Sequence, residues 1–130
     1  MWVTSLPNVR YLTGYAGSNG LVLLLHGESH FFTDPRYATD AKTNIDCKVH
    51  ICKGPLYQDA IRVVQRKRLK KIGFDPTQLT VSTHRALHDG LPSLVAVSGL
   101  VEKLRAVKSA TEIAKIERSV QINSEAFVRT

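Results

Sequence analysis

Short runs of apolar and β-branched residues, each bounded by turn-forming residues, recur along the chain and predict β-strands. These runs comprise residues 21–26, 30–33, 48–52, 71–74 and 94–97. Trp2 and Val3 are typical of the end of one more strand. The Gly-Glu-Ser sequence at 27–29 predicts a turn that joins the first two runs as a hairpin.

Segments with helical periodicity alternate with the later runs. The predicted helices and their start signals are 34–43 with Asp34 and Pro35, 55–68 with Pro55, and 82–88 with Ser82. A hairpin followed by alternating strands and helices is typical of an α/β domain in which helices flank a mixed β-sheet. We therefore predict that fold class.

A last, longer helix is marked by the capping box of Ser109 and Glu112. Its apolar stripe consists of Ile113, Ile116, Val120 and Phe127, and Ile122 falls on the opposite, charged side. No glycine stop signal precedes Thr130, so we expect this helix to continue into a further domain. The predicted organisation is one domain over 1–108 and the start of a linker helix over 109–130.

Composition places the chain among ordinary globular proteins, because 43% of its 130 residues are hydrophobic and 22% are charged. The longest apolar run, 21–25, is far shorter than a membrane span, and no signal peptide pattern opens the chain. We expect a cytoplasmic protein with no membrane partner. Cys47 and Cys52 lie five positions apart, which on a strand sends them to opposite faces, and we expect both to be reduced.

The net charge of +7 is concentrated in one stretch, 62–71, which contains six Lys and Arg residues and no acid. Such a cluster can bind nucleic acid or another anion. It also has the spacing of the solvated face of an amphipathic helix, and no nucleic-acid-binding motif accompanies it. A free-standing basic module for nucleic acid or an anionic ligand is therefore kept as the alternative function.

The histidines do not form a recognisable metal or catalytic motif. His84 and His88 share one helix face, but the sequence HRALH lacks the glutamate of a zinc protease helix and offers no third ligand. His26, His30 and His50 lie at predicted strands, where hydrogen-bonded or solvated histidines are the ordinary case. We predict no metal ligand and no catalytic residue in this chain.

The segment LPNVRYLTGYAGSNG, residues 6–20, is rich in glycine and asparagine and is predicted to be a structured loop. Its glycine spacing does not match a phosphate-binding loop. Its polar and aromatic residues are the candidates for a functional site: Asn8, Arg10, Tyr11, Tyr15, Ser18 and Asn19. A purely structural alternative has glycines in tight turns, Tyr11 and Leu12 in an edge strand and Arg10 paired with an acid.

Four blocks occur in a familiar order: LPNVRYLTGYAGSNG, FFTDPRY at 31–37, IGFD at 72–75 and the stretch 97–122. Together they closely resemble the N-terminal domain of Xaa-Pro aminopeptidases and Xaa-Pro dipeptidases, the family related to prolidase and creatinase. The resemblance implies the creatinase/prolidase N-terminal fold, with its ribonuclease H-like motif, here without its first helix. It adds the family motif residues Asp34, Arg36 and Tyr37 to the candidate site.

In that family a separate C-terminal domain of the pita-bread fold carries two divalent metals, often manganese, on carboxylate and histidine ligands. The resemblance places those ligands beyond Thr130 and makes this domain non-catalytic. Its implied roles are to support a homodimer or higher oligomer and to control access of peptides with proline at the second position. The segment 6–20 would face the catalytic cleft or a neighbouring subunit, where Arg10 and a half-exposed Tyr15 contact the peptide. A creatinase-like parent remains an alternative.

Overall fold

A computed structural model describes residues 1–91 and 93–129 of the chain. The residues cluster into two compact units, Met1–Leu100 and Val101–Thr130, which are described separately. The first unit contains the β-sheet and the helices that pack on it. The second consists mainly of one long helix.

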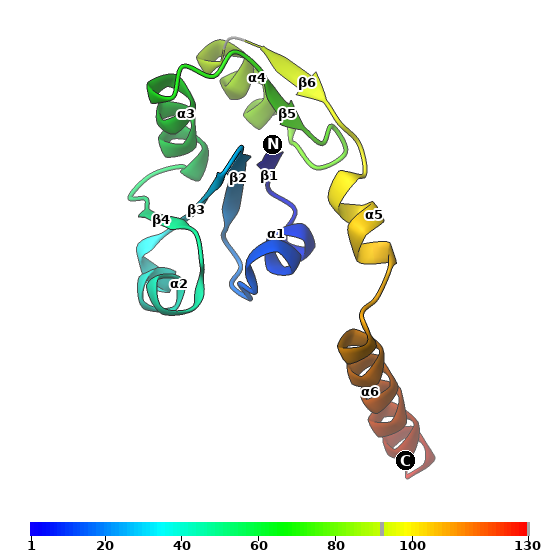
Figure 1. Ribbon diagram of the computed structural model, residues 1–130. Coiled ribbons are helices and arrows are strands. Elements are labelled where there is room, and N and C mark those ends of the chain that lie inside the picture. The colour runs from blue at the N-terminus through cyan, green and yellow to red at the C-terminus, as the bar shows by residue number, and fades with distance from the viewer. Residues whose placement is uncertain (92, 130) are drawn as a thin grey trace. The chain divides into compact units, whose positions relative to one another are not determined.

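The first unit is built on a six-stranded sheet of order β4-β3-β2-β1-β5-β6 (Figure 1). The strands are β1 (Trp2–Val3), β2 (Leu21–Leu25), β3 (Glu28–Thr33), β4 (Lys48–Ile51), β5 (Ile72–Phe74) and β6 (Leu94–Ala96). Only β2 is antiparallel to its neighbours, so the other five strands point the same way and end at one edge of the sheet. The predicted mixed sheet in an α/β fold is confirmed.

Five shorter elements accompany the sheet: α1 (Leu6–Thr13), the 3-10 helix η1 (Pro35–Tyr37), α2 (Ala38–Asn44), α3 (Leu56–Arg66) and α4 (Val81–Gly90). One face of the sheet forms the main core, in which Trp2, Leu23 and Phe32 pack with buried residues of α3 and α4. The residues that alternate with them, including Val22 and Phe31, are buried on the opposite face. Both faces of the sheet are therefore covered, which fits its largely parallel arrangement.

The structure corrects the prediction that 6–20 is a loop, because its first half is the helix α1. Pro7 sits in the first turn, where its missing N–H is tolerated, and Gly14 ends the helix in a left-handed conformation with φ 75°. Tyr11 and Leu12 are helical, so the edge-strand alternative is wrong as well. The Pro and Gly spacing was a helix signal that the other turn-forming residues of the segment concealed.

Two smaller corrections concern local signals. Thr80, not Ser82, caps α4, because its side chain accepts a hydrogen bond from the Thr83 N–H. The hairpin turn is shorter than predicted, since Glu28 already belongs to β3 and Gly27 supplies the positive φ of 76° that the tight turn needs. The predicted helix after Asp34 forms as η1 followed by α2.

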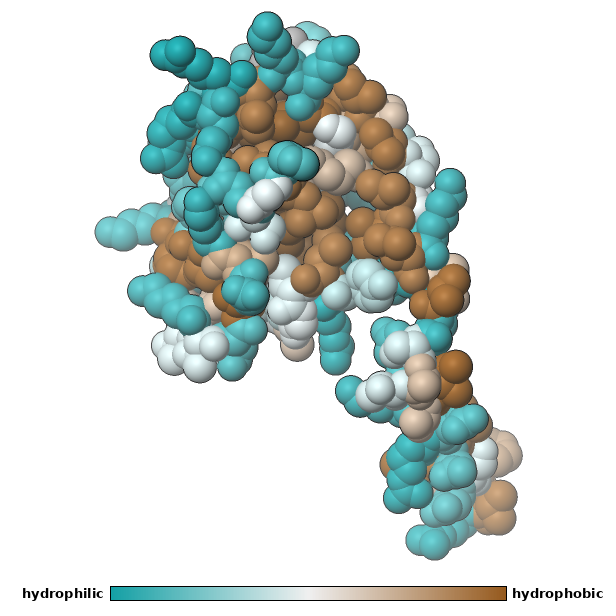
Figure 2. Space-filling view, in the orientation of Figure 1, coloured by the Kyte–Doolittle hydropathy of each residue, from teal (hydrophilic) through white to brown (hydrophobic). Residues whose placement is uncertain are grey.

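The second unit contains α6 (Ala110–Val128) and nearly all of α5 (Leu100–Ala106), a helix that was not predicted from the sequence. The capping box is confirmed: Ser109 Oγ accepts from the Glu112 N–H and Glu112 Oε2 accepts from the Ser109 N–H. None of the described residues of α6 is buried, and apolar side chains lie at its surface in Figure 2. Among the helices that the structure describes, none is long and apolar enough to cross a membrane.

Candidate functional site

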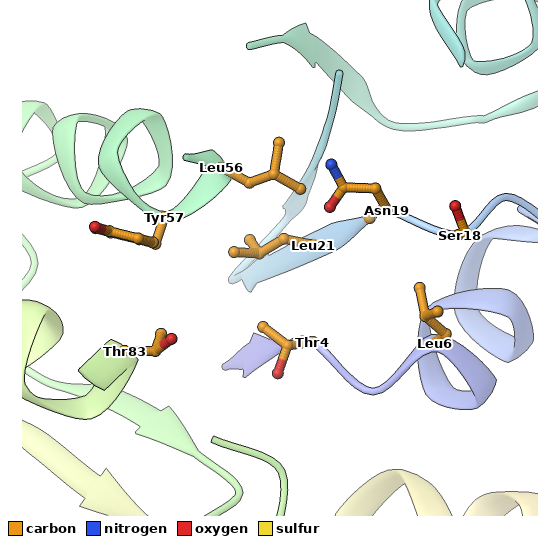
Figure 3. A pocket seen from close by; sticks show the side chains of 9 residues that line it. Thr4, Leu6, Ser18, Asn19, Leu21, Leu56, Tyr57 and Thr83 are labelled. Atoms are coloured by element: carbon orange, nitrogen blue, oxygen red, sulfur yellow. The ribbon is translucent and has the colours of Figure 1, made fainter. Parts of the chain in front are cut away.

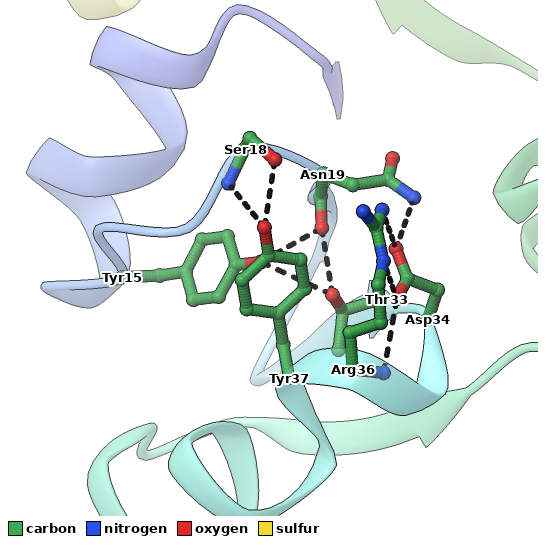
Figure 4. A network of polar contacts seen from close by, with 7 residues as sticks. All are labelled: Tyr15, Ser18, Asn19, Thr33, Asp34, Arg36 and Tyr37. Carbon is green, nitrogen blue, oxygen red and sulfur yellow. Dashed lines mark hydrogen bonds and ion pairs between the residues drawn. The ribbon is translucent and has the colours of Figure 1, made fainter.

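A network of polar contacts joins the segment after α1 to the carboxyl end of β3 (Figure 4). The Tyr15 hydroxyl lies 3.0 Å from the Asn19 carbonyl oxygen and 3.2 Å from Thr33 Oγ1. Thr33 Oγ1 in turn donates to the same Asn19 carbonyl at 2.6 Å. A Cβ on Gly17 would lie 2.1 Å from the Tyr15 hydroxyl oxygen, so only glycine allows this close approach.

Tyr15 is therefore part of the core, with only 3% of its surface exposed and its ring 4.8 Å from that of Phe31. The expectation that its ring stays half exposed is wrong. The glycines of GYAGSNG let the segment fold closely over this ring, because Gly20 also lies against both Tyr15 and Phe31. Tyr15 anchors the site and does not present a surface for a ligand.

Asp34 holds the side chain of Arg36 in a fixed orientation. Arg36 Nε donates to Asp34 Oδ1 at 2.9 Å and Nη2 donates to Oδ2 at 2.8 Å, which is a two-pronged arrangement. Asp34 also accepts from the Arg36 backbone N–H and from the amide nitrogen of Asn19. The Arg36 guanidinium and then the Asn19 amide hold the pKa of the Asp34 carboxyl well below its usual range. The Arg36 side chain remains 69% exposed, so an oriented cation faces solvent.

Tyr37 completes the network on the exposed side. Its hydroxyl lies 2.7 Å from Ser18 Oγ, and this contact together with the Ser18 N–H lowers the pKa of Tyr37. The Arg36 guanidinium carbon lies 5.3 Å from the centre of the Tyr37 ring, within the range of a cation–π contact. The Tyr15 and Tyr37 rings meet edge to face at 5.6 Å.

The structure thus brings together six of the nine candidate residues and separates three. The dashed lines of Figure 4 join Ser18 to Tyr37 and Asn19 to Asp34, which in turn holds Arg36. Tyr15 meets the Tyr37 ring edge to face. The other three lie on α1, where Asn8 is buried and Arg10 and Tyr11 are exposed. One residue of the network, Thr33, was not among the predicted candidates, although its buried hydroxyl bonds both Tyr15 and Asn19. Its place inside the FFTDPRY block was the only signal for it.

A hollow of about 390 Å³ lies beside this network (Figure 3). Ser18 and Asn19 belong to both, and the apolar part of its wall is formed by Leu6, Leu21, Leu56 and Tyr57. The hollow lies where β1 ends, β2 begins and α3 starts. No sequence motif could have indicated it, because its walls come from four separate parts of the chain.

The described residues include no group of three or more His, Cys, Asp or Glu side chains that could hold a metal ion. His84 packs against Phe74 with ring centres 5.3 Å apart, and His30 Nδ1 lies 2.9 Å from His50 Nε2. Both cysteines are free, and burial raises the pKa of the Cys52 thiol to about 12, which keeps it protonated. The arrangement around Arg36 is suited to binding an anionic or polar group and contains no activated nucleophile.

Residues 1–107 match the family described as the creatinase/prolidase N-terminal domain. Over 130 residues the chain is 35% identical to an uncharacterized peptidase of Bacillus subtilis, YqhT, covering 98% of this chain and 37% of that protein. The structure resembles an Xaa-Pro dipeptidase from Bacillus anthracis with 28% identity and a TM-score of 0.91, again covering 98% of this chain and 37% of the other.

A third match is the N-terminal domain of the cytoplasmic peptidase PepQ from Mycobacterium tuberculosis. It is 32% identical, has a TM-score of 0.73, and the match covers 80% of this chain and 85% of that one. The chain spans only 37% of the length of YqhT, and its match lies in an N-terminal domain. The resemblance found in the sequence is thereby confirmed, and the chain belongs to the creatinase/prolidase N-terminal domain family.

Proposed function

We propose that this chain serves as the non-catalytic N-terminal domain of a proline-specific metallopeptidase that hydrolyses Xaa-Pro peptide bonds. The proposal rests on family membership and on the likeness to an Xaa-Pro dipeptidase of which the chain covers about a third. Its main partner is a C-terminal catalytic domain, and the whole protein acts on peptides with proline at the second position. The boundary at 108/109 and a homodimeric or higher assembly remain part of this proposal.

The divalent metals of the reaction, manganese in our proposal, belong to the catalytic domain. The described residues of this chain do not fit a metal site, because no three potential ligands converge among them. A cytoplasmic location is supported by the likeness to the mycobacterial peptidase that is named as cytoplasmic. The part that this chain plays in the reaction is to bind and orient the peptide.

The observation that carries this role is the geometry of Arg36. Asp34 fixes the guanidinium from one side while most of the side chain stays exposed. A fixed guanidinium can donate two parallel hydrogen bonds to a peptide carboxylate or carbonyl without first losing rotational freedom. We assign to Arg36 the contact with the peptide that the sequence alone had suggested for Arg10 and Tyr15.

The alternative of a free-standing basic module is less well supported. Two of the six cations in 62–71 are engaged within the first unit, Lys67 with Glu28 and Arg62 with Asp59. The three relatives described above are named as peptidases, which supports the peptidase proposal over the basic module. Arg62 and Arg66 lie on the exposed face of α3, and the other four cations of the cluster follow the end of that helix at exposed positions, so the predicted helix face accounts for only part of the cluster.

The test is a kinetic comparison in the full-length protein with Xaa-Pro substrates. Arg36→Ala should raise KM about tenfold or more, with little change in thermal midpoint and unchanged metal content, because the contacts of Arg36 with Asp34 and Tyr37 are exposed and contribute little to folding. Arg66→Ala, an exposed arginine at the far end of α3, is the matched control and should leave KM unchanged. Equal KM values for the two variants would refute the role of Arg36, and a loss confined to Arg10→Ala would move the contact to α1.

A further inference from the structure

We propose that the hollow beside the network is a subsite for a large apolar side chain of a peptide, held together with its adjoining peptide group. This inference rests on the proposed function, because it names the part of a peptide substrate that the domain recognises. It concerns a different surface from Arg36, although the two share Ser18 and Asn19.

The position of the hollow is that of a ligand site in α/β proteins. Thr4 follows β1, Leu21 begins β2, and Leu56 and Thr83 lie in the first turns of α3 and α4. The hollow therefore opens at the edge where the parallel strands end, which is where ligands of open α/β sheets bind. Its volume of about 390 Å³ falls within the range of small-ligand pockets and has room for a large side chain with one peptide unit.

The chemistry of the walls selects a neutral, amphipathic group. None of the described residues that line the hollow carries a charge. Leucine and tyrosine side chains form its apolar side, and Leu6 is 39% exposed, so a bound side chain would remove apolar surface from water. A charged side chain would lose its hydration here without gaining a partner.

The polar side of the hollow can hold a peptide group. The Asn19 amide nitrogen donates to Asp34 Oδ2 at 2.7 Å, which fixes the side chain and leaves its oxygen as an acceptor for a peptide N–H (Figure 3). Thr4 and Ser18 also line the hollow. Thr4 Oγ1 donates to the Gln78 carbonyl and keeps lone pairs that can accept from a peptide N–H, while Ser18 Oγ is paired with the Tyr37 hydroxyl. Apolar and polar groups therefore face the hollow together, as a side chain with its backbone requires.

The inference is tested by binding of neutral probes to the full chain, followed by NMR shifts of the leucine methyl groups. N-acetyl-leucine amide should bind about tenfold more tightly than N-acetyl-glycine amide, because only the former fills the apolar wall. Leu6→Gln, at a partly exposed position that tolerates a polar side chain, should lower the affinity for N-acetyl-leucine amide roughly fivefold. Val81→Gln, which is 70% exposed on α4 and does not line the hollow, is the control and should have no effect.

Equal binding of the two probes, or equal binding to the wild-type and Leu6→Gln chains, would overturn the subsite. So would an absence of binding in the full-length protein, which would mean that another part of that protein fills the hollow. The probe comparison on the wild-type chain stands even if a variant fails to fold. Because the probes are uncharged, Arg36→Ala should not change their affinity. Failure of the subsite is thus distinguishable from failure of the proposed function, which appears in the KM of Arg36→Ala.

Discussion

A carboxylate paired with a cationic side chain stands at each end of β3, Glu28 as its first residue and Asp34 directly after its last, but the two pairings have different consequences. At the amino end Glu28 is paired with Lys48 of β4 and with Lys67, just after α3. At the carboxyl end Asp34 is paired with Arg36, only two residues away. The ion pairs of Glu28 connect β3, β4 and the end of α3. The ion pair of Asp34 connects no further element and orients one exposed side chain.

The surroundings of the two carboxylates also differ, because Glu28 lies beside packed rings whereas Asp34 lies near solvent and the hollow. Next to Glu28 the space is filled by stacked rings, with His50 4.5 Å from Phe32 and 5.2 Å from His30, and His30 is buried. Next to Asp34 the guanidinium faces solvent and the hollow lies on the other side of Asn19. The ion pairs of Glu28 join segments distant in sequence and therefore stabilise the fold. The ion pair of Asp34 is local and instead orients a side chain that can bind a ligand.

The largest expected effect tests whether the buried Tyr15 ring supports the polar network at the carboxyl end of β3. Tyr15→Ala should reduce the free energy of unfolding by about 3–5 kcal/mol, because it empties the buried space against Phe31. Tyr11→Ala, at a tyrosine that is 42% exposed, should change it by no more than about 0.5 kcal/mol. Denaturant unfolding of both variants measures the difference. Similar values would mean that Tyr15 does not anchor the network.

Thr33→Val examines the hydrogen bonds of the same anchor without creating a cavity. The buried hydroxyl bonds the Asn19 carbonyl and the Tyr15 hydroxyl, so its loss should cost about 1–2 kcal/mol. Thr39→Val, at an exposed position of α2, is the control for the substitution itself. A Thr33→Val protein as stable as the control would contradict a stabilising role of the Thr33 hydroxyl.

The amino end should make stability depend on pH near neutrality. Burial, followed by the neighbouring His30, lowers the pKa of His50, so the folded chain resists a proton that the unfolded chain binds at about pH 6.5. Stability should be complete above that pH and fall as the pH decreases below it. The slope from this residue should stay below about 1.4 kcal/mol per pH unit, because the unfolded chain binds at most one more proton at a single histidine.

Unfolding curves of the wild type and of His50→Gln, recorded between pH 7.5 and 5, measure this slope. That range brackets the pKa of an ordinary histidine. The variant should lose most of it. His26→Gln, at an exposed histidine of the hairpin turn, should retain it. An unchanged or steeper slope in His50→Gln would contradict His50 as its cause.

The smallest effects separate the two carboxylates. Glu28→Gln should lower the thermal midpoint modestly, because three elements lose their common partner. Asp34→Asn should lower it less, since an asparagine still accepts the bond from the Arg36 N–H at the start of η1. Thermal unfolding at low and high salt compares them. If Asp34→Asn lowered the thermal midpoint more than Glu28→Gln, the stabilising role assigned to Glu28 and the orienting role assigned to Asp34 would be contradicted.

The sequence predicted most of the fold, because the strands are short apolar runs and the helices after them carry clear start signals. It failed at α1, where asparagine and glycine residues suggested a loop although Pro7 and Gly14 bound a helix. It named Asp34, Arg36 and Tyr37 through the family motif but could not place them against Ser18 and Asn19. That pairing depends on β2 and β3 forming a hairpin, which brings residues 15–20 and 33–37 to one edge.

The burial of Tyr15 was also beyond the reach of the sequence. A tyrosine between glycines reads as an exposed ring, and only the packing on Phe31 shows that the glycines make room for it. The hollow depends on the approach of α3 and α4 to the ends of β1 and β2, which no local pattern encodes.

The central claim is that Asp34 acts on the substrate only by orienting Arg36, and a double-mutant cycle tests it most directly. kcat/KM for an Xaa-Pro substrate would be measured in the full-length wild type, Asp34→Asn, Arg36→Ala and the double variant. We predict that Asp34→Asn raises KM in the wild-type background with little change in kcat, and has no further effect once Arg36 is alanine. Losses that multiply across the two substitutions would show that the residues act independently and would contradict the claim.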